Sequence, residues 1–380
     1  MKPRERVLLA IEHREPDRVP LDFWTTPSTY IKLKEYLKVS EEDNINWSWA
    51  EPLKISDKVL KALNIDFRRV YLKRPRNWIP KRYPDGTIED EWGRGFKWIG
   101  EYLEYIKPPL ENISEVEELE EYSWPNPYVE GRTDNVMKTA RKLCEETDYA
   151  VMGFPTPPSM DLDPALSLLG FKNFLKYLVT NPKLIEAYLD KVCSIIIGFY
   201  DIFLDEVKDY IQVVYAPACD VAHQHGMLMS PNTWRKIIKP RYAKIVSFIK
   251  SKASNVKVFH HSCGALRPII PDLIEMGIDI LNPIQPLARG MNSRELKIEY
   301  GDKICFHGGI DLQKVMSFRG NIKDVEEEVK RRIKDLAPNG GYILAPAHNL
   351  QPDTSPEKIY VMYKYAAKYG VYPVNYSLLK

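Results

Sequence analysis

The sequence has no apolar run long enough to cross a membrane and almost no excess charge of either sign. No stretch approaches the roughly 18 consecutive apolar residues of a membrane span, and the apolar run near the start, Val7 to Ile11, is shorter than a secretion signal requires. The 54 basic and 52 acidic residues give a formal net charge of only +2. This balance gives no electrostatic reason to expect a nucleic acid or an acidic membrane as a partner.

Cysteine is also scarce. The five cysteines are odd in number and widely spaced, at Cys144, Cys193, Cys219, Cys263 and Cys305. Such a set argues against a disulfide framework and favours a reducing compartment. We therefore expect a cytoplasmic protein.

From about residue 150 onward, short apolar runs that end in polar or Gly/Pro-rich patches alternate with amphipathic segments. This alternation predicts strands followed by helices. The strand-and-loop segments are 149–159, 211–224, 256–264, 278–286, 303–311 and 341–349. The helical segments are 170–179, 182–207, 230–252, 268–277, 293–301, 325–337 and 355–370. Strands that alternate with helices of this length imply a parallel sheet.

The predicted fold class is α/β, a (β/α)8 TIM barrel that forms one domain over residues 1–380. A short helix is expected at the start, and the segment VPLDFW at 19–24 is expected to supply a further strand that closes the barrel. Residues from about 25 to 148 exceed the length of one strand-helix unit. This elaborated N-terminal segment, with DEWGRGFKW and YSWPNP, is expected to form a hairpin and loops that cover one end of the barrel.

Histidine is concentrated where a barrel enzyme would need it. Six of the seven histidines fall between residues 223 and 348. Most of them follow predicted strands, and the active sites of such barrels are built at the carboxyl ends of the strands.

The strand end FHHSCG at 259–264 carries the sharpest signal. Residues two apart in a strand point to the same side, so His261 and Cys263 can offer an imidazole and a thiolate to one ion, as zinc prefers. The pair makes only half of a tetrahedral site. His348, His307, Cys219 and His223 are the candidates for the remainder. The alternative is that Cys263 is a small buried apolar residue and His261 a hydrogen-bonded wall residue.

Other polar residues at strand ends are candidates for catalysis and substrate binding. His348 follows the apolar strand GYILAPA and is a candidate ligand, general acid or base, or substrate clamp. The remaining candidates are Asp22, Asp220, His223, Gln224, Asn282 and Asp311. Asp220 and Gln224 could instead fix a loop or cap a helix, and Asp311 could simply cap its helix. His225 and His260 are expected to be spectators.

Several segments in order resemble the uroporphyrinogen decarboxylase-like superfamily. They are RERVLLAIEHREPDRVPLDFW, DEWG, YSWPNP, LMSPNTWRKIIKPRY, HHSCG, DILNPIQP, FHGGIDLQ and GGYILAPAHNLQPDTSPEKI. The resemblance covers nearly the whole chain. It implies one of two activities: cofactor-free decarboxylation of a tetrapyrrole, or methyl transfer between a cobalamin-carrying protein and a thiol or folate-type acceptor.

The sequence matches each branch in part. The decarboxylases of this superfamily carry an arginine-rich loop after the first strand, whereas this chain reads FWTTPSTYIKLKEYL there, without an arginine. A polyanionic substrate needs such cations. His261 and Cys263 match the zinc ligands of the methyltransferases, but His348 stands where those enzymes have a second cysteine.

The leading hypothesis is therefore a corrinoid-dependent methyltransferase, with zinc on His261, Cys263 and His348 and cobalamin carried by a partner protein. Without zinc, Asp220 and Asn282 would anchor a pterin ring and His348 would be the acid. The first alternative is decarboxylation of a tetrapyrrole or another carboxylate, with His348 and Asp22 positioning the substrate. The second is a non-catalytic metal- or corrinoid-binding module. A homodimer is expected by analogy with the family.

Overall fold

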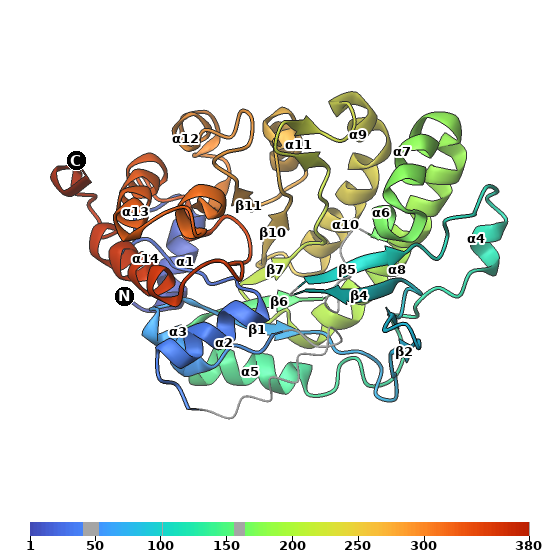
Figure 1. The fold of residues 1–380 in the computed structure, drawn as a ribbon, viewed down its shortest axis with the longest axis horizontal. Coiled ribbons are helices and arrows are strands. Elements are labelled where there is room, and N and C mark those ends of the chain that lie inside the picture. Colours follow the sequence, from blue (N-terminus) through green and yellow to red (C-terminus); the bar gives the residue numbers. More distant parts are fainter. Residues whose placement is uncertain (41–52, 101, 156–163, 380) are drawn as a thin grey trace.

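A seven-stranded parallel sheet forms the centre of the molecule (Figure 1). The computed structural model describes residues 1–40, 53–100, 102–155 and 164–379. The strands run in the order β1-β6-β7-β10-β11-β12-β13, and neighbouring strands are parallel. They are β1 (Phe67–Tyr71), β6 (Ala150–Phe154), β7 (Val213–Tyr215), β10 (Lys257–His261), β11 (Ile280–Ile284), β12 (Cys305–Ile310) and β13 (Tyr342–Pro346). The α/β class and the parallel sheet are thus confirmed.

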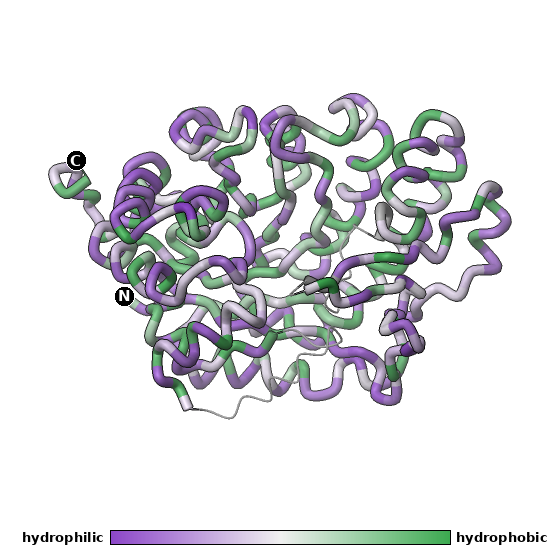
Figure 2. Tube along the Cα trace, in the orientation of Figure 1, coloured by the Kyte–Doolittle hydropathy of each residue, from purple (hydrophilic) through white to green (hydrophobic). Residues whose placement is uncertain are grey.

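Helices follow the strands and surround them, and hydrophilic residues gather on their outer turns (Figure 2). Side-chain caps start several of them: Asn181, Ser230 and Ser355 each accept a backbone N–H of the first turn, and each precedes a proline. The helices after β6 are α6 (Pro164–Leu169), α7 (Phe171–Thr180), α8 (Pro182–Val207), α9 (Pro231–Ile237), α10 (Lys239–Lys252), α11 (Ile270–Glu275), α12 (Ser293–Tyr300), α13 (Ile322–Leu336) and α14 (Pro356–Tyr369). The predicted 182–207 helix is confirmed at both ends.

Two predicted helices are wrong as single elements. The segment 230–252 forms α9 and α10, which are separated at Ile238. Pro240 explains the break, because proline has no backbone N–H to continue the helix and its ring clashes with the carbonyl of the residue four positions earlier. The segment 268–277 likewise divides into a 3-10 turn, Arg267–Ile269, and α11.

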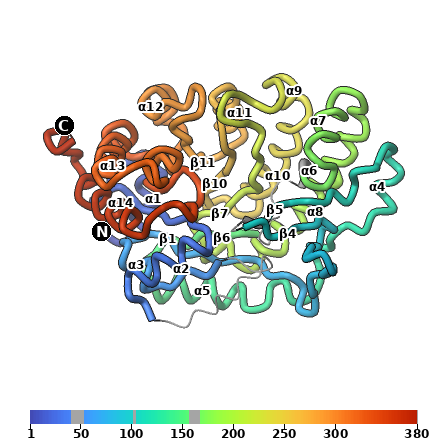
Figure 3. The backbone as a smooth tube through the Cα atoms, in the orientation of Figure 1, coloured from blue at the N-terminus to red at the C-terminus, as the bar shows by residue number. Residues whose placement is uncertain are grey.

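The predicted closing strand at 19–24 makes isolated bridges instead of a strand. Leu21 bridges Leu344 of β13, and Thr25 bridges Leu350, both in parallel. On the other side, the backbone N–H of Asp66, just before β1, donates to the carbonyl of Leu21 at 3.0 Å. The start of the chain therefore lies beside its last elements (Figure 3), while a fully closed eight-stranded barrel stays a prediction.

The segment from 25 to 148 contains more structure than a hairpin and loops. It includes a strand of the central sheet, β1, which the sequence interpretation missed, and a four-stranded antiparallel sheet of β2 (Lys81–Arg82), β3 (Ile88–Glu89), β4 (Gly95–Ile99) and β5 (Tyr102–Lys107). Its helices are α2 (Pro27–Tyr36), α3 (Asp57–Ala62), α4 (Glu118–Glu121) and α5 (Val136–Glu146). The antiparallel sheet follows the carboxyl end of β1. Residues 41–52 of the predicted segment lie outside the described residues.

The charges in β1 explain why it was missed. Its sequence, FRRVY, has two consecutive arginines, which a strand buried on both faces rarely contains. Arg68 pairs with Asp57 of α3 on one side, and Arg69 pairs with Asp22 on the other. Each charge is thus neutralised by a carboxylate outside the strand.

One cluster of buried apolar side chains extends from Val7, in the first helix α1 (Pro3–Ile11), to Leu379. Within the described residues, no helix is both long and apolar enough to cross a bilayer.

Candidate metal and substrate site

The predicted site residues meet at the carboxyl ends of the central strands. His261 is the last residue of β10, Asn282 lies in β11, His307 lies in β12, and His348 follows β13 by two residues. Parallel strands present their carboxyl ends at one edge of the sheet, so residues scattered over some 90 positions of the sequence become neighbours.

His261, Cys263 and His348 have the spacing of metal ligands. One ligand atom from each lies within 4.8 Å of the others. The His261 Nε2 to Cys263 Sγ distance is 3.6 Å. Two such atoms bound to one tetrahedral zinc, at bonds of about 2.0 and 2.3 Å, would be separated by about 3.5 Å, close to the observed distance. The donor set therefore fits zinc, and its role as a metal site stays a prediction.

Asn282 orients the His261 ring. Its Oδ1 lies 2.6 Å from His261 Nδ1, so that Nε2 is left to face Cys263. A ligating histidine typically bonds through its second nitrogen in this way, which fixes the ring and its tautomer.

Backbone contacts of its loop hold Cys263. The backbone N–H of Cys263 donates to Asp220 Oδ1 at 2.6 Å, and that of Gly264 donates to Gln285 Oε1 at 2.9 Å. The same Asp220 oxygen is 3.8 Å from His261 Nε2. Asp220 thus lies beside two of the three candidate ligands.

Gly264 permits this arrangement. Its φ is +94°, and a Cβ there would lie 2.8 Å from the carbonyl carbon of Ala222 and from the oxygen of His223. We expect Gly264→Ala to destabilise the protein by about 1–3 kcal/mol, because both backbone strain and this contact must be relieved. Urea unfolding measures the loss. The control is Gly226→Ala, in the loop after β7 that Gly264 packs against, where a Cβ meets nothing within 4 Å; equal losses in both variants would contradict the argument.

A cavity of about 240 Å³ opens beside Cys263 and His348. Gln285, Asp311, Gln313 and Gln351 contribute to its lining. Asp311 is buried, and its side chain accepts the N–H groups of Gln313 and Lys314 at the start of a π-helical turn, Leu312–Met316. The cap proposed as the alternative for Asp311 is therefore present, and its role in substrate binding stays a prediction.

His348 lies at the rim of this cavity. Its ring centroid is 5.9 Å from that of His261, and its side chain is exposed. The surrounding protein atoms, and then the His261 imidazole, lower the pKa of His348 to about 4. His348 is therefore neutral near pH 7, as a ligand or a proton acceptor must be.

The remaining candidates lie on the loop after β7. His223 is exposed and lies in a two-residue strand, Ala222–His223, with its ring 5.9 Å from that of His225. The Gln224 side chain accepts a hydrogen bond from Gln313 Nε2 at 3.0 Å, which links the loop after β7 to the loop after β12. Neither His223 nor Gln224 belongs to the candidate metal cluster.

Asp22 lies beneath the cavity and is completely buried. Arg69, His307 and the Trp24 indole N–H all donate to its carboxylate, at 2.7, 3.1 and 2.7 Å. Burial alone would raise the pKa of Asp22, but the charge of Arg69 and the hydrogen bond from His307 outweigh it and hold the pKa at about 2. Asp22 is therefore an ionised carboxylate that accepts hydrogen bonds from three surrounding side chains.

The sequence interpretation missed Arg69 and a cluster of aromatic side chains near the carboxyl ends of the strands. Trp24, Phe154, Tyr215 and Phe259 pack with ring centroids 4.8–6.1 Å apart. Arg69 lies 4.8 Å from the Trp24 ring centroid. The available signal was positional, since three of the four aromatic residues end or nearly end a strand.

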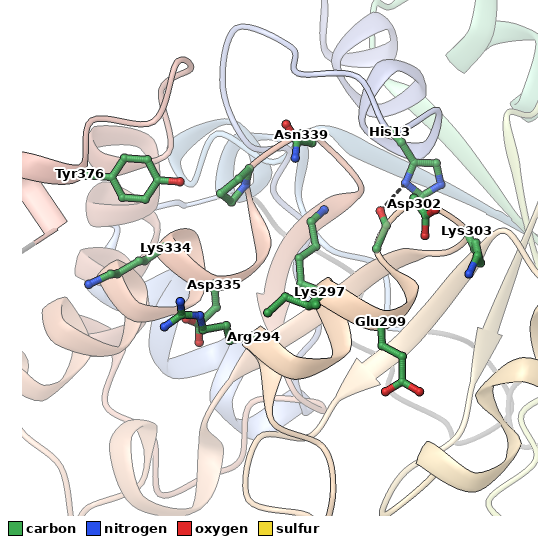
Figure 4. Close-up of a pocket in the computed structure, with 13 residues that line it drawn as sticks. His13, Arg294, Lys297, Glu299, Asp302, Lys303, Lys334, Asp335, Asn339 and Tyr376 are labelled. Carbon is green, nitrogen blue, oxygen red and sulfur yellow. Dashed lines mark hydrogen bonds between the residues drawn. The ribbon is translucent and has the colours of Figure 1, made fainter.

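A larger hollow, of about 710 Å³, lies at the opposite ends of the strands (Figure 4). It is lined by charged side chains of both signs, among them Lys297, Lys303, Glu299 and Asp302, and most of its lining is exposed. Gly301 and Asn339 precede β12 and β13, so this hollow is remote from the carboxyl ends where His261 and Cys263 lie. Its size does not make it the site of the chemistry.

A family model described as uroporphyrinogen decarboxylase (URO-D) matches residues 100–369. The chain belongs to the uroporphyrinogen decarboxylase family. Uroporphyrinogen decarboxylase of Chlorobium phaeovibrioides is 21% identical over 275 residues, 70% of this chain and 73% of the relative. That of Chlorobium luteolum is 22% identical over 209 residues, 53% and 55% of the two chains. Identities of 21–22% support membership of the family and do not define the substrate of this chain.

Among solved structures, a methyltransferase from Methanosarcina mazei superposes with a TM-score of 0.65. The match covers 97% of this chain and 99% of the other at 18% identity. At that identity the likeness shows a shared fold over nearly the whole chain.

Proposed function

We propose that this chain is a corrinoid-linked methyltransferase that holds zinc on His261, Cys263 and His348. Its two substrates are a corrinoid carried by a partner protein and a thiol or folate-type acceptor. The observation that carries the proposal is the meeting of two imidazoles and one thiol at a cavity, with ligand atoms within 4.8 Å of one another. The fold shared with the Methanosarcina methyltransferase is compatible with this activity.

Zinc at this position would supply a Lewis acid that lowers the pKa of a thiol acceptor. The protein's own residues do the positioning. Asn282 orients His261, and Asp220 holds the backbone of Cys263. Methyl transfer is an in-line displacement, so a fixed acceptor beside an open cavity supplies much of the acceleration by alignment. A neutral His348 at the rim can serve as the third ligand or, in a zinc-free site, as the proton-transfer group.

The zinc-containing form is favoured over a zinc-free site for a pterin. In the latter, Asp220 and Asn282 would bind the pterin ring. Asn282, however, is 4% exposed, and both ends of its amide already contact histidines, at 2.6 and 2.7 Å. A substrate could reach it only by breaking those hydrogen bonds.

Decarboxylation of a tetrapyrrole is the runner-up, supported by the two Chlorobium relatives. Its substrate needs cations, and the segment after residue 22 through α2 contains none of the expected arginines. Arg69 lies beside Asp22, but its side chain is largely buried and forms an ion pair with Asp22. Its single charge already compensates Asp22, so a substrate carboxylate bound there would give two carboxylates for one buried cation.

The proposal is tested by incubating the zinc-loaded protein with methylcobalamin and either coenzyme M or tetrahydrofolate. We expect the methyl–cobalt absorption band to disappear with the thiol, because the thiolate form of the acceptor is the nucleophile. A parallel assay offers uroporphyrinogen and measures released carbon dioxide. An unchanged methyl–cobalt band with both acceptors, together with carbon dioxide release, would reverse the ranking of the two activities.

A further inference from the structure

A continuous line of hydrogen bonds runs beneath the candidate site. Asp22 Oδ2 is 3.1 Å from His307 Nε2, His307 Nδ1 is 2.7 Å from Asn282 Nδ2, and Asn282 Oδ1 is 2.6 Å from His261 Nδ1. We call Asp22, His307, Asn282 and His261 the orienting network. Asp22 and His307 are 0% exposed and Asn282 is 4% exposed, so water does not offer these groups alternative partners.

The direction of these hydrogen bonds is determined from the Asp22 end. The Arg69 guanidinium, 2.7 Å from Asp22, keeps that carboxylate ionised, and an ionised carboxylate can only accept. His307 must therefore donate from Nε2. Burial lowers the pKa of His307 more than Asp22 raises it, so the ring is neutral and has one N–H. Its Nδ1 is then an acceptor.

The same reasoning continues to His261. The group of Asn282 that faces an acceptor nitrogen must be its NH2, which leaves its oxygen facing His261 Nδ1. His261 must carry its proton on Nδ1 to donate to that oxygen. Its Nε2 then has the free lone pair, and this nitrogen faces Cys263 Sγ at 3.6 Å. A reversed amide would place the proton on Nε2, where it would block a metal.

We infer that the buried Arg69–Asp22 pair sets, through His307 and Asn282, the tautomer of His261 that leaves Nε2 open toward Cys263. His307 and Asn282 are thus positioning residues. The tautomer follows from the hydrogen bonds alone, and only its use, metal binding, rests on the proposed function.

Histidine tautomers test this inference in metal-free protein. In two-bond ¹H–¹⁵N correlation spectra of ¹⁵N-histidine-labelled protein, we expect His261 to be protonated on Nδ1 and His307 on Nε2. His307→Phe keeps a ring against Trp24 and Phe259 but removes both hydrogen bonds. Asn282 is then free to reverse, and a second His261 tautomer, protonated on Nε2, should appear. Zinc affinity should fall about 10–100-fold, the usual effect of losing such an orienting partner.

The matched control is His260→Phe. His260 is also buried, precedes His261 in β10 and contacts Tyr242 on the other face of the strand. It should lose stability without changing the His261 tautomer. An unchanged tautomer in His307→Phe, or a wild-type His261 protonated on Nε2, would overturn the inference.

A second variant keeps the test decisive if His307→Phe does not fold. In Asn282→Asp, the carboxyl group accepts from His261 Nδ1, and the link to His307 Nδ1 needs one added proton, carried by either the carboxyl group or His307. In both cases His261 keeps its Nδ1 proton and His307 its Nε2 proton, so a His261 protonated only on Nε2 in this variant would contradict the inferred direction. Zinc titration of the wild-type protein distinguishes the orienting network from the proposed metal site. If the expected tautomers are found but zinc does not bind, the network is supported and the metal site is refuted.

Discussion

Cys263→Ala is expected to lose stoichiometric zinc and to lower methyl-transfer activity by more than about 100-fold. Removing an orienting partner alone typically costs 10–100-fold in affinity or activity, and Cys263 would be a direct ligand and the only thiolate of the set. Two imidazoles that remain would offer no compensating negative charge to the ion. Metal content is measured after dialysis, and activity by the loss of the methyl–cobalt band.

Cys144→Ala is the matched control for this experiment. Cys144 lies on α5, and its backbone carbonyl accepts a hydrogen bond from Arg4, which alanine preserves. The variant should keep both zinc and activity. Full activity in a metal-free wild-type protein, or in Cys263→Ala, would exclude the thiol-acceptor mechanism.

Asp22→Asn is expected to cost about 3–5 kcal/mol in the free energy of unfolding. Removal of one charge of a buried pair leaves the other uncompensated, and here Arg69 would be left beneath the cavity without its carboxylate. Guanidinium unfolding measures the loss. Asp134→Asn is the control, because Asp134 pairs with Arg76 and the two side chains are 37% and 54% exposed. That variant should lose less than about 1 kcal/mol.

The pH dependence gives this prediction a second readout. The pKa of Asp22 is about 2 in the folded protein and near 3.8 when unperturbed, so the unfolded state binds the proton more readily. Its stabilising contribution is therefore present above about pH 4 and is lost as the pH falls toward 2. The difference in stability between wild type and Asp22→Asn should shrink across this range. A difference independent of pH would show that Asp22 is not ionised in the fold.

The residues that could be predicted from the sequence are those whose local pattern matches their final environment. The 182–207 helix has a cap, a proline at its first turn and a continuous apolar face, and it forms with those bounds. The His-x-Cys pair was recognisable because strand periodicity alone puts both residues on one side. His348 could be added because apolar residues led up to it.

The features that were missed depend on partners remote in the sequence. A strand reading FRRVY looks polar until Asp22 and Asp57 are known to neutralise it. Likewise, Asp22 and Asn282 were predicted as groups that touch substrate, from their position at strand ends. In the fold, each is already hydrogen-bonded to His307, which is remote from both in the sequence. Their predicted catalytic and binding roles remain predictions, and the geometry favours positioning.

The position of Asp22 and Arg69 in the chain has one more consequence. The family-model match covers residues 100–369 and includes all three candidate ligands, whereas both members of the buried pair precede it. In our inference the proton on His261 therefore depends on two residues from the first seventy of the chain. Joining residues 100–369 to the N-terminal part of another family member would test whether zinc affinity depends on the ligands alone or also on the first seventy residues.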